Sequence, residues 1–88
     1  MNTDNRYSVV KDIYAAKRIE EFHQIFDYIP KTVVAEDIGT SAKRITRLIE
    51  EPHTFTGEEI YQMSQLFGIP LDKFFMLLMK NFIEKMKH

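Results

Sequence analysis

Apolar residues recur every three or four positions along this chain, and no stretch alternates strictly between apolar and polar residues. The first spacing is typical of amphipathic α-helices, whereas strict alternation would indicate β-strands. Glycines and prolines divide the pattern into helix-sized segments at Pro30, Gly39, Pro52, Gly68 and Pro70. The sequence therefore predicts a single all-α domain over residues 1–88, built from five helices.

The first predicted helix covers Val10 to Tyr28. Pro30 disfavours helical geometry at the residue before it, so the helix must end there. One apolar stripe follows three- and four-residue steps along this helix and consists of Ile13, Ala16, Ile19, Phe22, Phe26 and Ile29.

Two short helices are expected on either side of Gly39. The first covers Lys31–Ile38, and Gly39 suits the left-handed position that often follows a helix. The second begins after Ser41, whose hydroxyl can accept a hydrogen bond from a free N–H group of the first turn. The residues expected to face inward are Val34, Ala35, Ile38, Ile45, Leu48 and Ile49.

The fourth helix has a clear start and stop. Thr56 and Glu59 have the spacing of a capping box, and Gly68 ends the helix. Its inward residues are Ile60, Met63, Leu66 and Phe67.

The C-terminal helix, residues 71–86, is extended and unusually apolar. Phe74, Leu77 and Leu78 are expected to pack inward. A second stripe remains, formed by Phe75, Met79, Phe82 and Met86, and it is either further core or a homodimer interface. We take it as the candidate dimer interface.

Composition argues against several function classes. The chain has no cysteine, which excludes disulfides and thiol chemistry, and its three histidines lack metal-ligand spacing. It shows no nucleophile–base pattern and no glycine-rich phosphate loop, so we expect no enzyme, no cofactor and no small-molecule substrate. No apolar run is long enough to span a membrane, and no signal segment is evident, so a soluble cytoplasmic protein is expected.

The spacing of Ala35, Gly39 and Ile45 is typical of a helix-turn-helix, with its core at residues 31–50. A small residue lets two helices cross closely, a glycine turns the chain, and an apolar residue on the second helix packs back. In such a motif the exposed N-terminal half of the second helix enters a DNA major groove.

This stretch resembles the Cro/repressor-like helix-turn-helix family, also called the XRE family, which has the lambda-repressor-like fold. The similarity covers Ile19 to Phe75 and includes the fourth helix, from Thr56 to Gly68, and the opening of the fifth, from Ile69 to Phe75. The resemblance implies a five-helix domain whose third helix docks on double-stranded DNA. Near the end of the third helix the family usually has Glu followed by a polar residue and Gly, whereas this chain has Ile49, Glu50 and Glu51.

By position, the resemblance implies base contacts from Ala42, Lys43 and Arg47, with Arg44 and Thr46 nearby. It implies backbone contacts from Lys31, Thr40 and Ser41, with His53 and Thr54 as further candidates. The alternative for the basic cluster of Lys43, Arg44 and Arg47 is an ordinary solvent-exposed helix face.

The sequence therefore predicts a sequence-specific DNA-binding regulator that acts as a homodimer on a near-palindromic site. The alternative is a protein-interaction module that has the same fold and does not bind DNA. The net charge of −1, the Glu50–Glu51 pair and the surplus of apolar residues in the C-terminal helix support this second interpretation.

Overall fold

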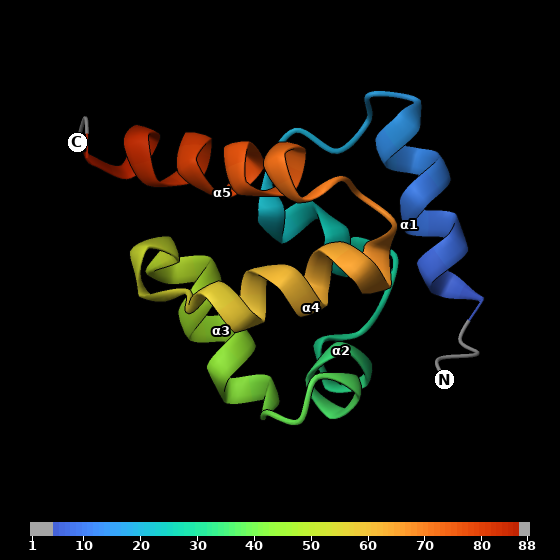
Figure 1. Cartoon of the computed structure of the whole chain (residues 1–88), viewed down its shortest axis with the longest axis horizontal. Helices are drawn as coiled ribbons and strands as arrows, with labels where there is room; N and C mark the ends of the chain where they lie inside the picture. Colours follow the sequence, from blue (N-terminus) through green and yellow to red (C-terminus); the bar gives the residue numbers. More distant parts are fainter. Residues whose placement is uncertain (1–4, 87–88) are drawn as a thin grey trace.

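The computed structural model describes residues 5–86, except for the side chains at positions 81 and 85, and consists of helices joined by short turns (Figure 1). Its elements are α1 (Arg6–Ala15), η1 (Phe22–Asp27), α2 (Lys31–Asp37), α3 (Ala42–Glu50), η2 (Pro52–Thr54), α4 (Gly57–Phe67) and α5 (Leu71–Met86), where η marks a 3-10 helix. No strand occurs in the described part of the chain. The all-α prediction is confirmed.

The elements surround α4, which crosses the middle of the molecule (Figure 1). α5 runs along one edge, α2 and α3 lie at the opposite edge, and α1 closes one end. α4 packs against both α1 and α5, whereas α3 packs against α2 and η2. One core therefore holds the start of α3 far from α5, while η2, which follows α3, packs against α5.

Aromatic side chains from three elements meet in this core. Phe22 of η1, Phe67 of α4 and Phe74 of α5 are all fully buried. The ring of Phe74 lies 6.0 Å from that of Phe22 and 5.9 Å from that of Phe67, at inclined angles. Such pairs add about 0.5–1.5 kcal/mol to the stabilisation from burial alone. The nine buried residues that the sequence placed inward on α2 to α5 are Val34, Ala35, Ile45, Leu48, Met63, Phe67, Phe74, Leu77 and Leu78.

The prediction of one helix from Val10 to Tyr28 is wrong. α1 ends at Ala15, and Lys17 adopts a left-handed conformation with φ of +62°. The N–H of Lys17 donates to the Tyr14 carbonyl at 2.9 Å, and the N–H of Arg18 donates to the Ile13 carbonyl at 3.1 Å. These two bonds satisfy carbonyls of the last turn in the manner of a Schellman motif. A lysine therefore occupies a position that usually holds glycine.

The chain then forms η1 instead of a longer α-helix. Phe22 and Ile25 are buried three residues apart within η1, which matches the three residues per turn of a 3-10 helix, and Ile19 is buried in the turn before it. Ala16, predicted to face inward, is exposed. α1 contributes Tyr7 and Val10 to the core in its place.

Candidate nucleic-acid interface

α2 and α3 are joined by a tight turn whose geometry is set by Gly39. Its φ of +75° is left-handed, and the Thr40 N–H donates to the Ala35 carbonyl at 2.8 Å. The Ser41 hydroxyl then caps α3 by accepting a hydrogen bond from the Arg44 N–H at 3.2 Å. The predicted turn and cap are both confirmed, because each depends on residues close in sequence.

One side of α3 is fixed in the core. Ile45 and Leu48 are fully buried, and Val34 and Ala35 of α2 are buried in the same core. Since the side chains of a helix project in all directions, burial of this side directs the opposite side of α3 to the surface.

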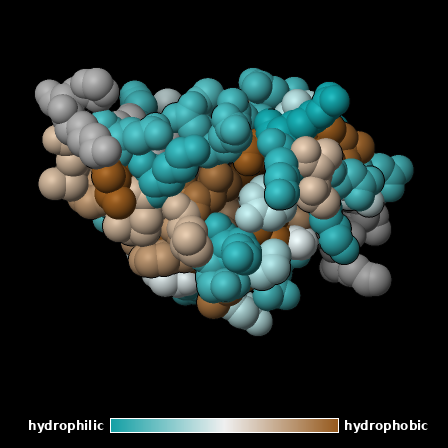
Figure 2. All heavy atoms as spheres, turned by 90° about the horizontal axis from the view of Figure 1, so that it is seen from above, coloured by the Kyte–Doolittle hydropathy of each residue, from teal (hydrophilic) through white to brown (hydrophobic). Residues whose placement is uncertain are grey.

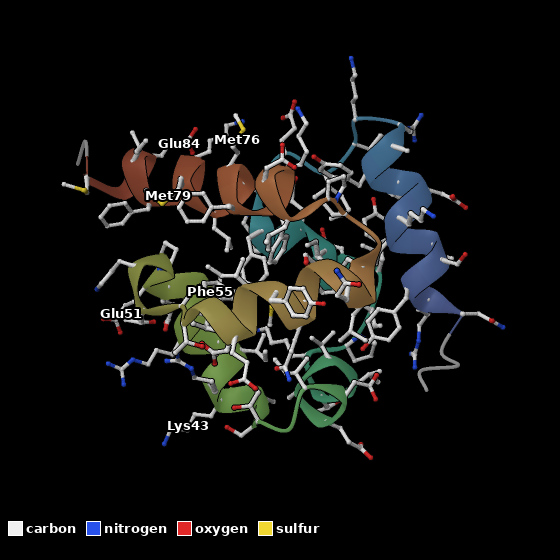
Figure 3. All side chains as sticks on the ribbon, in the orientation of Figure 1. Lys43, Glu51, Phe55, Met76, Met79 and Glu84 are labelled. Carbon is white, nitrogen blue, oxygen red and sulfur yellow. The ribbon has the colours of Figure 1, made fainter. Side chains whose placement is uncertain are left out.

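Lys43 and Arg47 occupy that outward side, one helical turn apart. Both residues are exposed, and the Arg47 side chain is 61% accessible. Lys43 points away from the body of the molecule, at the edge opposite α5 (Figure 3). The predicted exposure of both cations is confirmed. Together they form a small basic surface, which we call the α3 surface.

Arg44, in contrast, is bound within the molecule. Its Nε donates to Glu59 Oε2 at 3.0 Å and its Nη2 donates to Glu59 Oε1 at 2.8 Å, so the ion pair has two hydrogen bonds. Nη2 also donates to the Thr54 carbonyl at 2.7 Å. The hydrogen bonds from Arg44 lower the pKa of the Glu59 carboxyl, and those to Glu59 raise the pKa of the Arg44 guanidinium. Arg44 therefore ties α3 to the start of α4.

Lys31 and Thr46 connect α2 with α3. The Lys31 ammonium donates to Thr46 Oγ1 at 3.2 Å, and the same hydroxyl donates to the Ala42 carbonyl at 3.2 Å. All three residues are half-buried. They lie beside the α3 surface. The Thr46 hydroxyl is already engaged in two hydrogen bonds within the molecule.

Glu50 and Glu51 follow Lys43 and Arg47 along the chain. Arg47 Nε lies 3.5 Å from Glu51 Oε2, four residues later on the chain. Both side chains are largely exposed, so solvent and salt screen the attraction. The ion pair of Arg47 with Glu51 reduces the positive potential of the α3 surface without burying Arg47.

The remaining predicted backbone-contacting residues lie near the ends of α3. Ser41 is exposed and Thr40 is half-buried. The Thr54 hydroxyl donates to the Glu51 carbonyl at 2.8 Å. His53 is exposed, and its ring lies 5.7 Å from the ring of Phe82 on α5.

The partners of Arg44 were missed by the sequence analysis. Glu59 lies fifteen residues from Arg44, beyond any pattern of neighbouring residues. The available signal was the capping box: the Glu59 carboxylate accepts the Thr56 N–H at 2.9 Å, and this bond holds it at the first turn of α4. The same carboxylate thus serves the cap and the ion pair.

The structure exposes only two of the four residues of the predicted dimer stripe on α5. Phe75 and Met86 are exposed, whereas Met79 and Phe82 are half-buried. The exposed apolar residues on α5 are Leu71, Phe75, Met76, Ile83 and Met86. Met76 and Ile83, which the prediction left out, are therefore more accessible than Phe82, which lies beside His53.

Among the described residues, no group of three or more histidines or carboxylates could hold a metal ion, and no helix is both long and apolar enough to cross a bilayer. Comparison with protein-family models, with curated proteins and with solved structures gives no match.

Proposed function

We propose that this protein is a sequence-specific DNA-binding regulator that places the N-terminal half of α3 in the major groove and acts as a homodimer. The observation that carries the proposal is the exposure of Lys43 and Arg47 on the outward side of a capped helix that follows a glycine turn. Arginine donates two hydrogen bonds to guanine O6 and N7, and lysine donates to the same atoms.

The proposal gives the predicted residues around α3 three roles. In this proposal the exposed Lys43 and Arg47 contact base edges, with Ala42 beside them, and Thr40, Ser41 and Lys31 contact phosphates. Arg44 takes a positioning role in this proposal, because its guanidinium is engaged by Glu59 and Thr54.

Salt dependence of binding to a mixed-sequence duplex tests the proposal. At low salt the wild-type protein binds, and the logarithm of its affinity falls linearly with the logarithm of salt concentration. Arg47→Ala and Lys43→Ala each remove a cation that the proposal sets against the duplex, so each weakens binding at low salt. Lys31→Ala removes the cation assigned to a phosphate, so it reduces the magnitude of the slope by about 1. Fluorescence anisotropy of a labelled duplex measures the affinity, and its change with salt concentration gives the slope.

Arg18→Ala is the matched control. Arg18 is exposed in the turn after α1, away from α3 (Figure 1). This variant leaves the slope unchanged. Absence of salt-sensitive binding at low salt, or an equal loss for Arg18→Ala and Arg47→Ala, would overturn the proposal.

The second candidate is a protein-interaction module. The observation that favours it is the exposed apolar face of α5, together with a net charge of −1. Such a module has no affinity for the duplex even at low salt. The same titration therefore distinguishes the two functions.

A further inference from the structure

The outward face of α5 carries four apolar residues at a regular spacing. Met76, Met79, Ile83 and Met86 follow one another at steps of three, four and three residues. This is the spacing at which one side of a helix meets a second helix along its length. Met76 is 62% exposed, Ile83 is 49% exposed and Met86 is 69% exposed. We call these four residues the α5 stripe.

The opposite side of α5 is already used. Phe74 and Leu78 are buried in the core, so the α5 stripe is turned away from it. Figure 2 shows apolar atoms, tan to brown, gathered along one part of the surface beside a band of polar atoms. Exposed apolar surface of this kind marks a site of association.

From this pattern we infer that the α5 stripe binds the α5 stripe of a second copy of the chain, with the two helices antiparallel. The inference specifies the homodimer of the proposed function and does not depend on DNA affinity. The spacing of three, four and three is the same read in either direction. An antiparallel copy therefore opposes every member with an apolar residue: Met76 faces Met86 of the second copy, and Met79 faces its Ile83.

Charge at the border of the stripe favours the same partner. Lys80 and Glu84 line one shallow hollow with Met76, Met79 and Ile83. In the antiparallel register each Lys80 lies two residues, or about 3 Å along the axis, from the level of Glu84 in the other copy. In a parallel pair Lys80 would face the flank that holds Phe75 and Phe82. The antiparallel pair therefore places opposite charges together twice.

The oligomeric state in solution tests the interface. Sedimentation of the wild-type chain gives a dimer at micromolar concentration, and Ile83→Glu raises the dimer dissociation constant by at least about 30-fold, because a charge replaces an apolar contact in its centre. Circular dichroism checks that the variant remains folded, as expected for a half-exposed position. Val9→Glu, at a residue of α1 that is 44% exposed, is the matched control and leaves the dimer intact.

Charge exchange tests the pairing of Lys80 with Glu84. Lys80→Glu weakens the dimer, and the double variant Lys80→Glu with Glu84→Lys restores it. A wild-type chain that stays monomeric up to millimolar concentration overturns the inference, as does a dimer that Ile83→Glu does not weaken.

Cysteine cross-linking tests the direction, and the chain has no native cysteine to interfere. A mixture of Met79→Cys chains and Ile83→Cys chains forms a disulfide between the two variants under mild oxidation. Met79→Cys alone does not, because the two copies of residue 79 are offset by about 6 Å along the axis, and with the distance between helices this exceeds the reach of a disulfide. A parallel dimer gives the reverse result and would overturn the antiparallel register. DNA binding is measured separately, so its failure leaves this test unaffected.

Discussion

Arg44 of α3 and Glu59 of α4 form an ion pair with two hydrogen bonds, of 3.0 and 2.8 Å, across fifteen residues of sequence. The Arg44 side chain is 24% exposed and the Glu59 side chain 16%, so the pair is sheltered from solvent. Charge-assisted bonds of this two-pronged kind are among the stronger polar interactions in proteins. The pair ties α3 to the start of α4, and together with the buried Ile45 and Leu48 it holds the helix that carries Lys43 and Arg47.

Glu59→Gln is expected to destabilise the fold by about 1–3 kcal/mol, since it removes the ion pair and leaves a guanidinium with fewer acceptors. Urea unfolding followed by circular dichroism measures the change. Glu58→Gln, at the exposed neighbouring position, is the control and should change stability by less than about 0.5 kcal/mol. Equal effects of the two variants would contradict the role given to Glu59.

The contribution of Glu59 to stability is expected to depend on pH. Hydrogen bonds from Arg44 lower the pKa of Glu59 in the folded state, so the unfolded chain binds a proton more readily. The contribution is therefore complete above the unfolded pKa of about 4.3 and is lost as the pH falls through the lower folded value. Unfolding free energies of wild type and Glu59→Gln should converge in acid. A difference that stays constant from neutral pH into acid would contradict this origin.

Lys17→Gly is expected to stabilise the protein by about 1 kcal/mol, because Lys17 has a φ of +62°, which glycine adopts without steric cost. Gly39→Ala tests the same effect in the opposite direction. Gly39 has a φ of +75°, and an added Cβ there would meet no atom within 4 Å, so no clash adds to the backbone strain. This variant should lose a similar amount of stability. Thermal unfolding of both variants checks the pair, and a destabilised Lys17→Gly would show that the lysine makes a contact that outweighs the strain.

Glu51→Gln is expected to increase affinity for DNA by several-fold, since it removes a negative charge 3.5 Å from the Arg47 guanidinium. The gain should shrink as salt is raised, because both side chains are largely exposed. Anisotropy titrations at two salt concentrations measure it. Glu20→Gln, in the turn between α1 and η1, carries the same charge change away from α3 and is the control. A gain of the same size for both variants would show a general effect of net charge.

The parts of the fold that sequence predicted well depend on local chemistry. The cap at Ser41, the capping box at Thr56 and the left-handed Gly39 each involve residues within a few positions of one another. Helix periodicity likewise placed Ile45 and Phe74 in the core. Such features need no knowledge of the rest of the chain.

The parts that sequence missed depend on distant contacts. The break at Lys17 has no glycine or asparagine to signal it, and the core selected this geometry for Ile19 and Phe22 over a continuous helix. Arginine is a residue type that often contacts DNA, so Arg44 was predicted as such a contact. Only the fold brings Glu59 to it. Phe82 lies beside His53, so the apolar spacing of α5 alone could not choose between two adjacent stripes.

The most direct measurement of the central claim is an NMR titration of the isotopically labelled protein with a short duplex. The account predicts that the largest amide shift changes fall on residues 40–47, at the turn and the first two turns of α3, with the side-chain signal of Arg47 among them. Changes confined to α1 or α5, or no changes at low salt, would contradict the assignment of α3 as the DNA-binding element.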